Sequence, residues 1–477
     1  MLWAIVFAAT LLGLTIAESP GKEKKSAAPE HHSLTLEGAI SIALKQNPDL
    51  LKAVHEIERT RGQVIEVRAQ ALPTLNAAGT YTQYDPALLQ SGGFSSSATS
   101  GSTALIGSSQ DKSWRITLQV QQTIYSGGKV RAALKIADLT EDASHQLLRE
   151  TVATVIAKVR TQFYTALLNR ELITVAGESI VLLADQLKDQ QNRFDAGTVP
   201  RFNVLQAEVE LANARPDLIR SKNNFHISRL ELGKTLGLDT DDEPDVLGAL
   251  RMPPREVNLA RALATARRNR AILKVQKNTI ETEEQQITVA KAGYKPKLDA
   301  NVGYEFVNSR KSTDLAKVTN GWYLGVTGSW AIFDGLKTKG QVDQARARLA
   351  SAKVNLSDSV QQVELEVQKA YAQAKVSREV IASQSKVVEQ ADEALRLAKE
   401  RLSAGAGTQL DVLNARVALT KARTTQKQAL SDYNVALAEY DRATGAETIY
   451  DPSLPDPKAK SAIGTLRRGG AALRPAD

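Results

Sequence analysis

One short stretch occurs twice in the chain, as Arg193-Phe-Asp-Ala-Gly197 and again as Arg401-Leu-Ser-Ala-Gly405. The copies are 208 positions apart, and the same offset relates Asn203-Val-Leu205 to Asp411-Val-Leu413. Two copies are too few for an ordinary solenoid, in which several repeats stack on one another. The pattern therefore indicates that one structural unit has been duplicated.

The two copies differ in length upstream of these motifs. Pro73 matches Pro296 and Tyr81 matches Tyr304 at an offset of 223, so the first copy is 15 residues longer. The extra length falls near a Ser-, Gly- and Thr-rich segment at 90–110, which is typical of a loop. The predicted divisions are a first unit at 34–237, a connecting segment at 238–256, a second unit at 257–445 and a tail at 446–477.

Each unit contains a long segment with an apolar residue at every seventh position. In the second unit these positions are Val360, Val367, Ala374, Ile381, Val388, Leu395 and Leu402. The first unit is apolar at all seven equivalent positions, from Val152 to Phe194. A heptad pattern of this length, without internal proline, predicts coiled-coil-like helices at 129–194 and 337–402. At about 1.5 Å per residue, each is roughly 100 Å long.

Shorter helices are predicted beside each long one. In the first unit one begins at Asn47-Pro48, where Asn can cap the helix and Pro suits its first turn, and another spans 201–236. Together they are about as long as the long helix, so they can form a second wall antiparallel to it. The matching last helix of the second unit spans 409–444. Pro216 is expected to interrupt and bend its helix, and its repeat partner is Thr424.

Two pairs of strands are predicted between these helices, at about 75–125 and about 297–333. Apolar and polar residues alternate in them, for example from Trp114 onward and from Trp322 onward. Strands of about ten residues with one apolar face and aromatic residues near their ends are typical of transmembrane barrels. A half-buried strand of a soluble sheet gives the same alternation. The aromatic residues expected at the membrane interface are Tyr81, Trp114, Tyr304, Trp322 and Trp330.

Four strands are too few to close a barrel, because about eight is the smallest number observed. Lipid does not tolerate open sheet edges, so copies of the chain would have to share one barrel. Three copies would supply twelve strands.

Composition excludes several classes of protein. The chain has no cysteine, which excludes disulfides, thiolate catalysis, Cys-bound metals and a lipidated N-terminal Cys. The net charge is +8, but Lys and Arg alternate with Glu and Asp along the helices, which favours solvated helix faces over a nucleic-acid site. Residues 1–17 are apolar and predict a signal peptide cleaved near Ala17, followed by a linker at 18–33. No Lys or Arg precedes this segment, so a short membrane anchor is the alternative.

The sequence contains no recognisable catalytic constellation. His31-His32 lies in a polar linker, where a solvated tail is favoured over a weak metal site. Gly127-Gly128-Lys129 lacks the spacing of a phosphate-binding loop and predicts a strand-to-helix turn. We therefore expect no enzyme activity, no cofactor and no metal.

The duplicated set of motifs resembles the TolC family of outer-membrane efflux proteins over about residues 34–445. The matching residues are the two copies of the Arg193–Gly197 stretch, Asn47-Pro-Asp-Leu50 and Tyr125-Ser-Gly-Gly128. The resemblance implies a mixed α and β membrane protein, localised to the outer membrane with a large periplasmic portion. It implies a homotrimer whose long antiparallel helices form an α-barrel and whose strands form a shared 12-strand β-barrel in outer-membrane lipid. It further implies a periplasmic adaptor protein and an inner-membrane pump as partners, in efflux or type I secretion.

The resemblance also implies a gate at the periplasmic tips of the helices. Asp411 matches an Asp that forms a constricting acidic ring, and Asn414 and Asn203 stand where some members have further Asp residues. Gly407 and Leu402 replace an Arg and a Tyr of some gates, which disfavours a hydrogen-bonded latch. A role of Asp411 as a helix cap is the alternative from the residues alone. The implied adaptor-contacting tips are Ala196, Gly197, Thr198, Ala404, Gly405 and Ala406.

The function that follows is a passive exit duct for efflux or secretion. An acidic ring in a narrow pore would attract cations and make the constriction sensitive to them. The alternative is a periplasmic or surface coiled-coil scaffold without a pore.

Overall fold

The computed structural model describes residues 33–83, 85, 112–239, 242–308, 315–316 and 318–445. The predicted signal peptide, most of the linker with His31-His32, the loop at 90–110 and the tail at 446–477 lie outside these residues.

Two helices of equal length run along the molecule, α4 (Lys129–Asp195) and α8 (Lys337–Ser403), each of 67 residues. They are the two predicted heptad helices, each one residue longer than expected. Near the middle of the molecule the heptad positions Val152, Val159 and Val367 are buried in the core. Near the tip of the second unit Leu395 is also buried in a core cluster, whereas Phe194 at the end of α4 is 37 % exposed. The heptad positions therefore contribute to the core both in the middle of the molecule and near the second tip.

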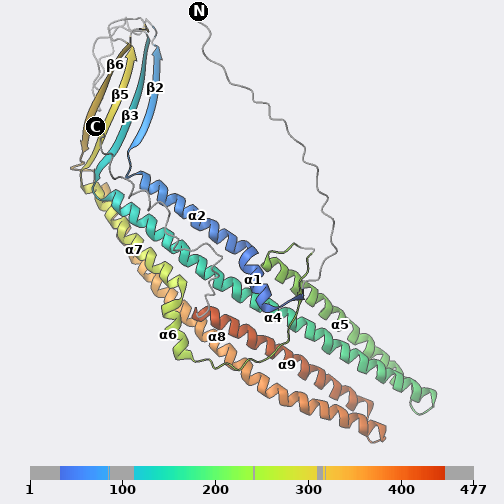
Figure 1. The fold of residues 1–477 in the computed structure, drawn as a ribbon. Coiled ribbons are helices and arrows are strands. Elements are labelled where there is room, and N and C mark those ends of the chain that lie inside the picture. The colour runs from blue at the N-terminus through green and yellow to red at the C-terminus, as the bar shows by residue number, and fades with distance from the viewer. Residues whose placement is uncertain are drawn as a thin grey trace, which may run out of the picture.

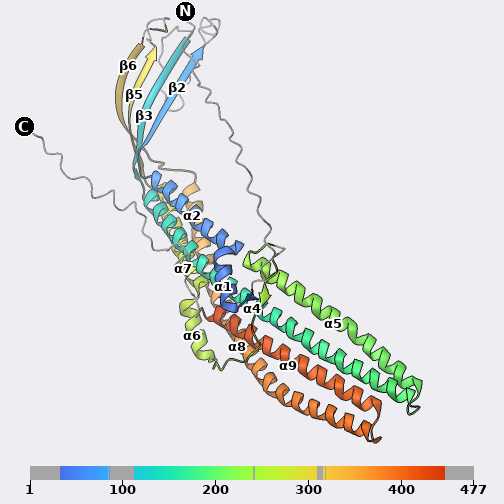
Figure 2. The same cartoon turned by 45° about the vertical axis from the view of Figure 1, so that its right-hand side comes forward.

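Shorter helices cover the long ones, as predicted. Along α4 lie α2 (Pro48–Ala69) toward one end and α5 (Arg201–Leu236) toward the other (Figure 1). The second unit repeats this with α7 (Ala271–Lys291) and α9 (Gln409–Thr444) on α8. Because α7 and α9 also pack against α4, they join the two units side by side (Figure 2).

Pro216 does not interrupt its helix. α5 is continuous from Arg201 to Leu236 with Pro216 inside it, so the predicted break is wrong. A proline removes one intrahelical hydrogen bond, and the remaining bonds with the packing against α4 suffice to keep the helix in one piece.

The middle of the molecule contains elements that the pattern did not predict. α1 (Leu36–Gln46) and α6 (Leu259–Asn269) precede α2 and α7, and each ends where Asn47 or Arg270 leaves helical geometry. The short strands β1 (Ser33–Leu34) and β4 (Asp245–Val246) pair in parallel. Through Val246 and Leu250 the connecting segment joins the largest core cluster, which contains Phe163 and Leu167 of α4.

Buried ion pairs connect the units at this level. Arg270 is almost fully buried and contacts Glu150 of α4 at 3.0 Å and Glu366 of α8 at 3.2 Å. Asp441 of α9 is equally buried and pairs with Arg160 of α4 at 3.0 Å and with Arg255 at 2.6 Å. Buried charges are tolerated only when they are paired, so these contacts hold the middle of the two units in register.

A four-stranded antiparallel sheet extends from one end of the helices (Figure 1). Its strands are ordered β2 (Thr74–Gln83), β3 (Lys112–Ser126), β5 (Lys297–Asn308) and β6 (Val318–Ser329). The last strand ends at Ser329, earlier than the predicted 333, and Trp330 lies just outside it. Among the described residues, no helix has a stretch that is both long and apolar enough to cross a membrane.

Tight turns connect the sheet to the long helices. Gly127 and Gly128 both have positive φ immediately before α4, so the predicted strand-to-helix turn is confirmed. The equivalent positions before α8 are Gly335 and Leu336, and Leu336 has φ +67° although it carries a side chain. A short 3-10 turn, η1 (Ala292–Tyr294), leads from α7 into β5.

Candidate functional site

The sheet has one continuous apolar face. Cross-strand partners lie on the same face of a sheet, and the register pairs Tyr81 with Trp114, Leu118 with Tyr304 and Tyr304 with Trp322. The same face therefore carries, from edge to edge, Leu75, Ala77, Tyr81, Trp114, Ile116, Leu118, Val120, Val302, Tyr304, Phe306, Trp322, Leu324 and Val326. Many of these side chains are open to solvent in the single chain, with Trp322 75 % and Leu324 69 % exposed. A patch of this kind marks a surface that another apolar phase covers.

The opposite face of the sheet is polar. Arg115 pairs with Glu305 at 3.1 Å across β3 and β5, and Thr123 donates to Asp299 at 2.7 Å. The alternation predicted from Trp114 onward therefore separates the two faces across all four strands. A bulge between Thr123 and Tyr125 shifts the register at the end next to the helices.

Four of the five predicted interface aromatics lie on the apolar face. Tyr81, Trp114, Tyr304 and Trp322 face the same side, and the indole of Trp114 donates to the carbonyl of Leu315 at 3.1 Å. Trp330 follows β6 at the opposite end, where its indole donates to the carbonyl of Tyr294 at 3.1 Å. The structure therefore places the aromatic residues near both ends of the sheet.

The two helical hairpins turn with the same geometry at the far end of the molecule. In the first, the amide of Gly197 donates to Phe194 at 2.8 Å and that of Thr198 to Arg193 at 2.9 Å. In the second, Gly405 and Ala406 donate to Leu402 and Arg401. This is a Schellman turn, which needs a residue with positive φ after the helix, and both glycines have φ +74°. The predicted tip residues are exposed in both turns.

Asp411 forms part of the cap of α9. Its backbone amide donates to the Thr408 hydroxyl at 3.2 Å, and its carboxylate accepts from the Thr408 amide at 2.8 Å, which completes a capping box. These hydrogen bonds from Thr408 favour the charged carboxylate and lower the pKa of Asp411 below its usual value. The cap role left open by the sequence is therefore present.

The other predicted gate residues lie on two different helices. Asn414 is exposed one turn further along α9, and Asn203 lies in the first turn of α5. Within the part of the chain that the structure describes, no hydrogen bond joins Asn203 to Asp411 or Asn414. Residues other than these three connect the two hairpins.

Polar contacts between the hairpins were missed by the sequence analysis. Gln190 of α4 donates to Gln409 of α9 at 3.0 Å and is only 2 % exposed. Further from the tip, α9 contacts α4 through Arg423 with Glu178 at 2.6 Å and Lys427 with Glu171 at 2.8 Å. The sequence does contain a sign of this contact. Gln190 is the repeat partner of Ala398, 208 residues later, at a heptad position where an apolar residue is expected.

A cavity of about 290 Å³ lies beside Gln190, between α4, α8 and α9. Arg416 of α9 borders it and is buried, with its nearest carboxylate, Glu210, at 3.7 Å. Burial disfavours the charged guanidinium and lowers the pKa of Arg416. The packing between the hairpins is therefore incomplete at this level. No group of three or more His, Cys, Asp or Glu side chains able to hold a metal ion occurs among the described residues.

Comparison with known proteins adds the family context. The model of the outer membrane efflux protein family matches residues 39–238 and 262–446. The outer membrane protein TolC of Escherichia coli is 24 % identical over 426 residues, covering 86 % of this chain and 81 % of TolC. The cobalt-zinc-cadmium resistance protein CzcC of Cupriavidus metallidurans is 22 % identical over 420 residues, covering 86 % and 90 %.

Solved structures have the same fold. The CmeC outer membrane channel of Campylobacter jejuni superimposes with a TM-score of 0.74 at 18 % identity, covering 88 % of this chain and 87 % of CmeC. The outer membrane protein VceC of Vibrio cholerae gives a TM-score of 0.72 at 17 % identity, covering 86 % and 96 %.

Proposed function

This chain belongs to the outer membrane efflux protein family, and we therefore propose that three copies of it assemble into a passive exit duct gated at its periplasmic tips. The family is located in the outer membrane, and the relatives of this chain include the outer membrane protein TolC and the alkaline protease secretion protein AprF. The chain is accordingly an efflux or secretion duct component, and the trimer and its gating are the proposed part.

The apolar face of the sheet carries this proposal. Lipid would cover that face, while the polar face with Arg115 and Glu305 would line a water-filled lumen. In the sheet, β2 and β6 are edge strands, and an unpaired edge is not tolerated in lipid. Closure therefore needs β6 of one copy to pair with β2 of the next, and three copies give a twelve-strand barrel.

The helices support a tunnel below the barrel. α4 and α8 run without a break from the sheet to the tips, and the covering helices connect neighbouring walls. Three copies of this arrangement would enclose a tube whose narrow end lies at the Schellman turns. The exposed turns are available to a periplasmic adaptor, which would transmit the action of an inner-membrane pump.

The duct is tested by reconstituting the purified protein in planar lipid bilayers. We expect discrete and reproducible conductance steps, because a closed barrel with a polar lumen conducts ions. Protein that is folded and inserted yet gives no defined conductance would contradict the duct and favour a scaffold without a pore.

The trimer is tested with engineered cysteines, since the chain has none of its own. Thr80→Cys on β2 and Thr319→Cys on β6 lie at the same level of the sheet on its two edges. With both changes in one chain, a flexible bis-maleimide should join copies into a ladder that stops at the trimer. Each single variant serves as the control and should stay largely uncrosslinked. A ladder that ends at dimers or continues beyond trimers would contradict the proposed assembly.

The gate is tested at Asp411. In a narrow trimeric tip three carboxylates lie close together and attract multivalent cations. Asp411→Asn should therefore weaken block by such cations by about tenfold when they are added from the tip side. Asn414→Asp, which adds one carboxylate on the next turn, should strengthen the block. If block by multivalent cations is unchanged in both variants, Asp411 and Asn414 do not form part of the gate.

A further inference from the structure

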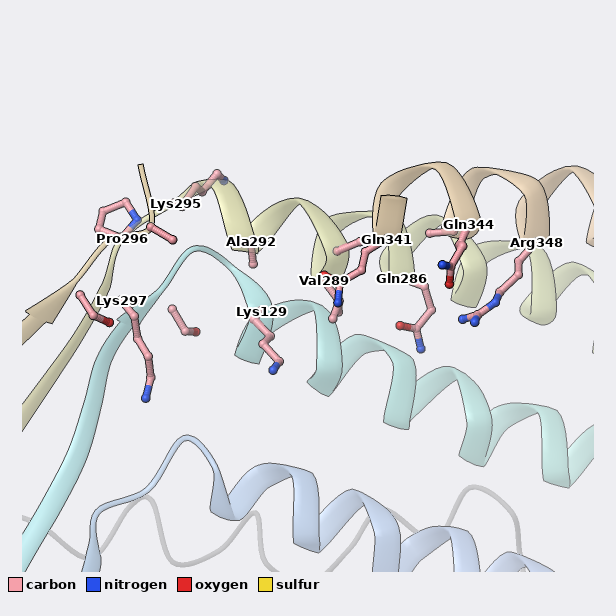
Figure 3. Close-up of a pocket in the computed structure, with 16 residues that line it drawn as sticks. Lys129, Gln286, Val289, Ala292, Lys295, Pro296, Lys297, Gln341, Gln344 and Arg348 are labelled. Atoms are coloured by element: carbon pink, nitrogen blue, oxygen red, sulfur yellow. The ribbon is translucent and has the colours of Figure 1, made fainter. Parts of the chain in front are cut away.

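A second candidate site lies at the other end of the helices, where they meet the sheet. A cavity of about 590 Å³ opens between the start of α4, the end of α7 and the start of α8. Its size falls within the range of about 300–1,000 Å³ typical of small-molecule sites. Figure 3 shows Lys129 and Lys297 at the sheet end of the cavity, and Arg348 with Gln344 reaching from α8 at the other end.

The charged residues that line this cavity are all cations: Lys129, Lys295, Lys297 and Arg348. Lys297 pairs with Asp299 at 2.8 Å. Within the described part of the chain, no carboxylate forms an ion pair with Lys129, Lys295 or Arg348. Glu283 lies one turn before Gln286 on α7 but does not line the cavity. Each copy of the chain therefore presents three unpaired positive charges here.

Neutral hydrogen-bonding groups fill the space between the cations. Gln286 comes from α7, and Gln341 and Gln344 come from α8. Amide groups can donate hydrogen bonds to an anion without adding charge of their own. The positive groups are distributed along the length of the cavity, which suits an extended polyanion better than a single small ion.

The cavity opens on the polar side of the sheet. Lys297 pairs in register with Ser126 and with Ser329, and all three line the cavity. They lie on the same face as Asp299, opposite the apolar face that carries Trp322. A headgroup of the lipid around the barrel would contact the apolar side, so the cavity faces the lumen.

We propose that this cavity is an anion-binding site and that its three copies form a cationic collar in the lumen, where barrel and tunnel meet. The collar would concentrate anions at this level and favour the passage of anionic cargo, in particular solutes that carry several phosphate or carboxylate groups. The proposal of a collar rests on the proposed trimeric duct, whereas anion binding by each cavity requires only the folded protein.

Binding is measured first, by isothermal titration of the detergent-purified protein with tripolyphosphate. The double variant Lys129→Gln with Arg348→Gln should bind roughly tenfold more weakly than the unmodified protein, because two unpaired positive charges are lost. The matched control is Lys135→Gln with Lys353→Gln, which removes two charges from the same two helices outside the cavity. The control should bind as the unmodified protein does.

Ion selectivity is measured next, from the reversal potential of the reconstituted channel in a potassium chloride gradient. The cavity variant should shift selectivity toward potassium relative to both the unmodified protein and the control. Defined conductance with equal reversal potentials in all three proteins would contradict the collar and leave the duct standing. If no conductance is seen, the duct is contradicted, but the titration still tests the anion-binding site. Equal affinities of the three proteins, or no binding by the unmodified protein, would overturn that site.

Discussion

Leu336 is the one non-glycine residue with positive φ in the described part of the chain. Its counterpart in the first copy is Gly128, which adopts this conformation freely. A residue with a Cβ pays about 1–2 kcal/mol for left-handed geometry. The side chain of Leu336 is largely exposed, so little packing compensates for that strain.

Leu336→Gly should therefore stabilise the protein, by up to about 1 kcal/mol after the greater entropy of glycine in the unfolded chain is subtracted. The midpoint of thermal unfolding in detergent measures the change. Leu336→Ala is the control, because it shortens the side chain but keeps the strain. An equal gain in both variants would mean that the exposed leucyl side chain, rather than the backbone, is responsible.

Asp411 is expected to make the stability of the second hairpin tip depend on pH. The hydrogen bonds from Thr408 lower the pKa of Asp411 in the folded state. The charged carboxylate therefore stabilises the folded state at pH values above its unfolded-state pKa. That effect is lost as the pH falls through the lower folded value, which lies beneath the usual 3.8. Hydrogen-exchange protection of the start of α9 should drop on acidification to about pH 3. Asp411→Asn cannot titrate at this position, and a drop of the same size in that variant would contradict the prediction.

At the scale of elements, the two hairpins are joined by side chains on α4 and α9. The part-buried hydrogen bond from Gln190 to Gln409 lies next to the tips, while the ion pairs of Arg423 and Lys427 lie further from them. Ion pairs at exposed and partly exposed positions stabilise by only about 0–1 kcal/mol each, so these two pairs would oppose a separation of the hairpins only weakly. If the proposed gate lies at the tips, these contacts would hold it closed with little free energy.

Gln190→Ala together with Gln409→Ala should therefore increase the open probability of the reconstituted channel by roughly a hundredfold, since one hydrogen bond contributes about 1 kcal/mol in each of the three proposed copies, or about 3 kcal/mol in all. Single-channel recording measures the change. Gln191→Ala is the matched control, because this neighbour is exposed and its side chain donates to Asp195 of its own helix. If the control channel is open as often as the double variant, the hydrogen bond between Gln190 and Gln409 does not control opening.

At the scale of the whole molecule, the proposed barrel would place the apolar face of the sheet against lipid and the polar face against water. Leu118→Arg places a charge on the apolar face, where it costs about 2–4 kcal/mol near the bilayer midplane. Folded trimer recovered from outer-membrane fractions should fall sharply. Gln119→Arg changes the adjacent residue on the polar face and should be tolerated. If both variants assemble equally well, lipid does not cover the apolar face.

The polar lumen would also differ along its length. The proposed collar presents unpaired cations where the sheet meets the helices, and Asp411 presents a carboxylate at the tips. The signs are opposite at the two ends of the tunnel. Cargo would meet the acidic tip first and the cationic collar last.

Much of the fold was predictable because its signals are local along the chain. The heptad positions from Val360 to Leu402 predicted α8, the Asn47-Pro48 cap predicted the start of α2, and the alternation from Trp114 predicted the apolar face of β3. Because the two units are copies of each other, an element predicted in one unit was also expected at the equivalent positions of the other. Gly127-Gly128 predicted its turn because positive φ favours glycine.

The sequence by itself determined the helices, the strands and their duplication, since periodicity and capping act within a few neighbouring residues. Only the tertiary structure decided that Gln190 contacts Gln409, that Arg270 pairs with Glu150 and Glu366, and that Lys129 and Arg348 line one cavity. These partners are far apart in the chain, and their meeting depends on how whole helices pack. Side-chain pairing across such distances leaves no period in the sequence, which is why these contacts became visible only in the folded molecule.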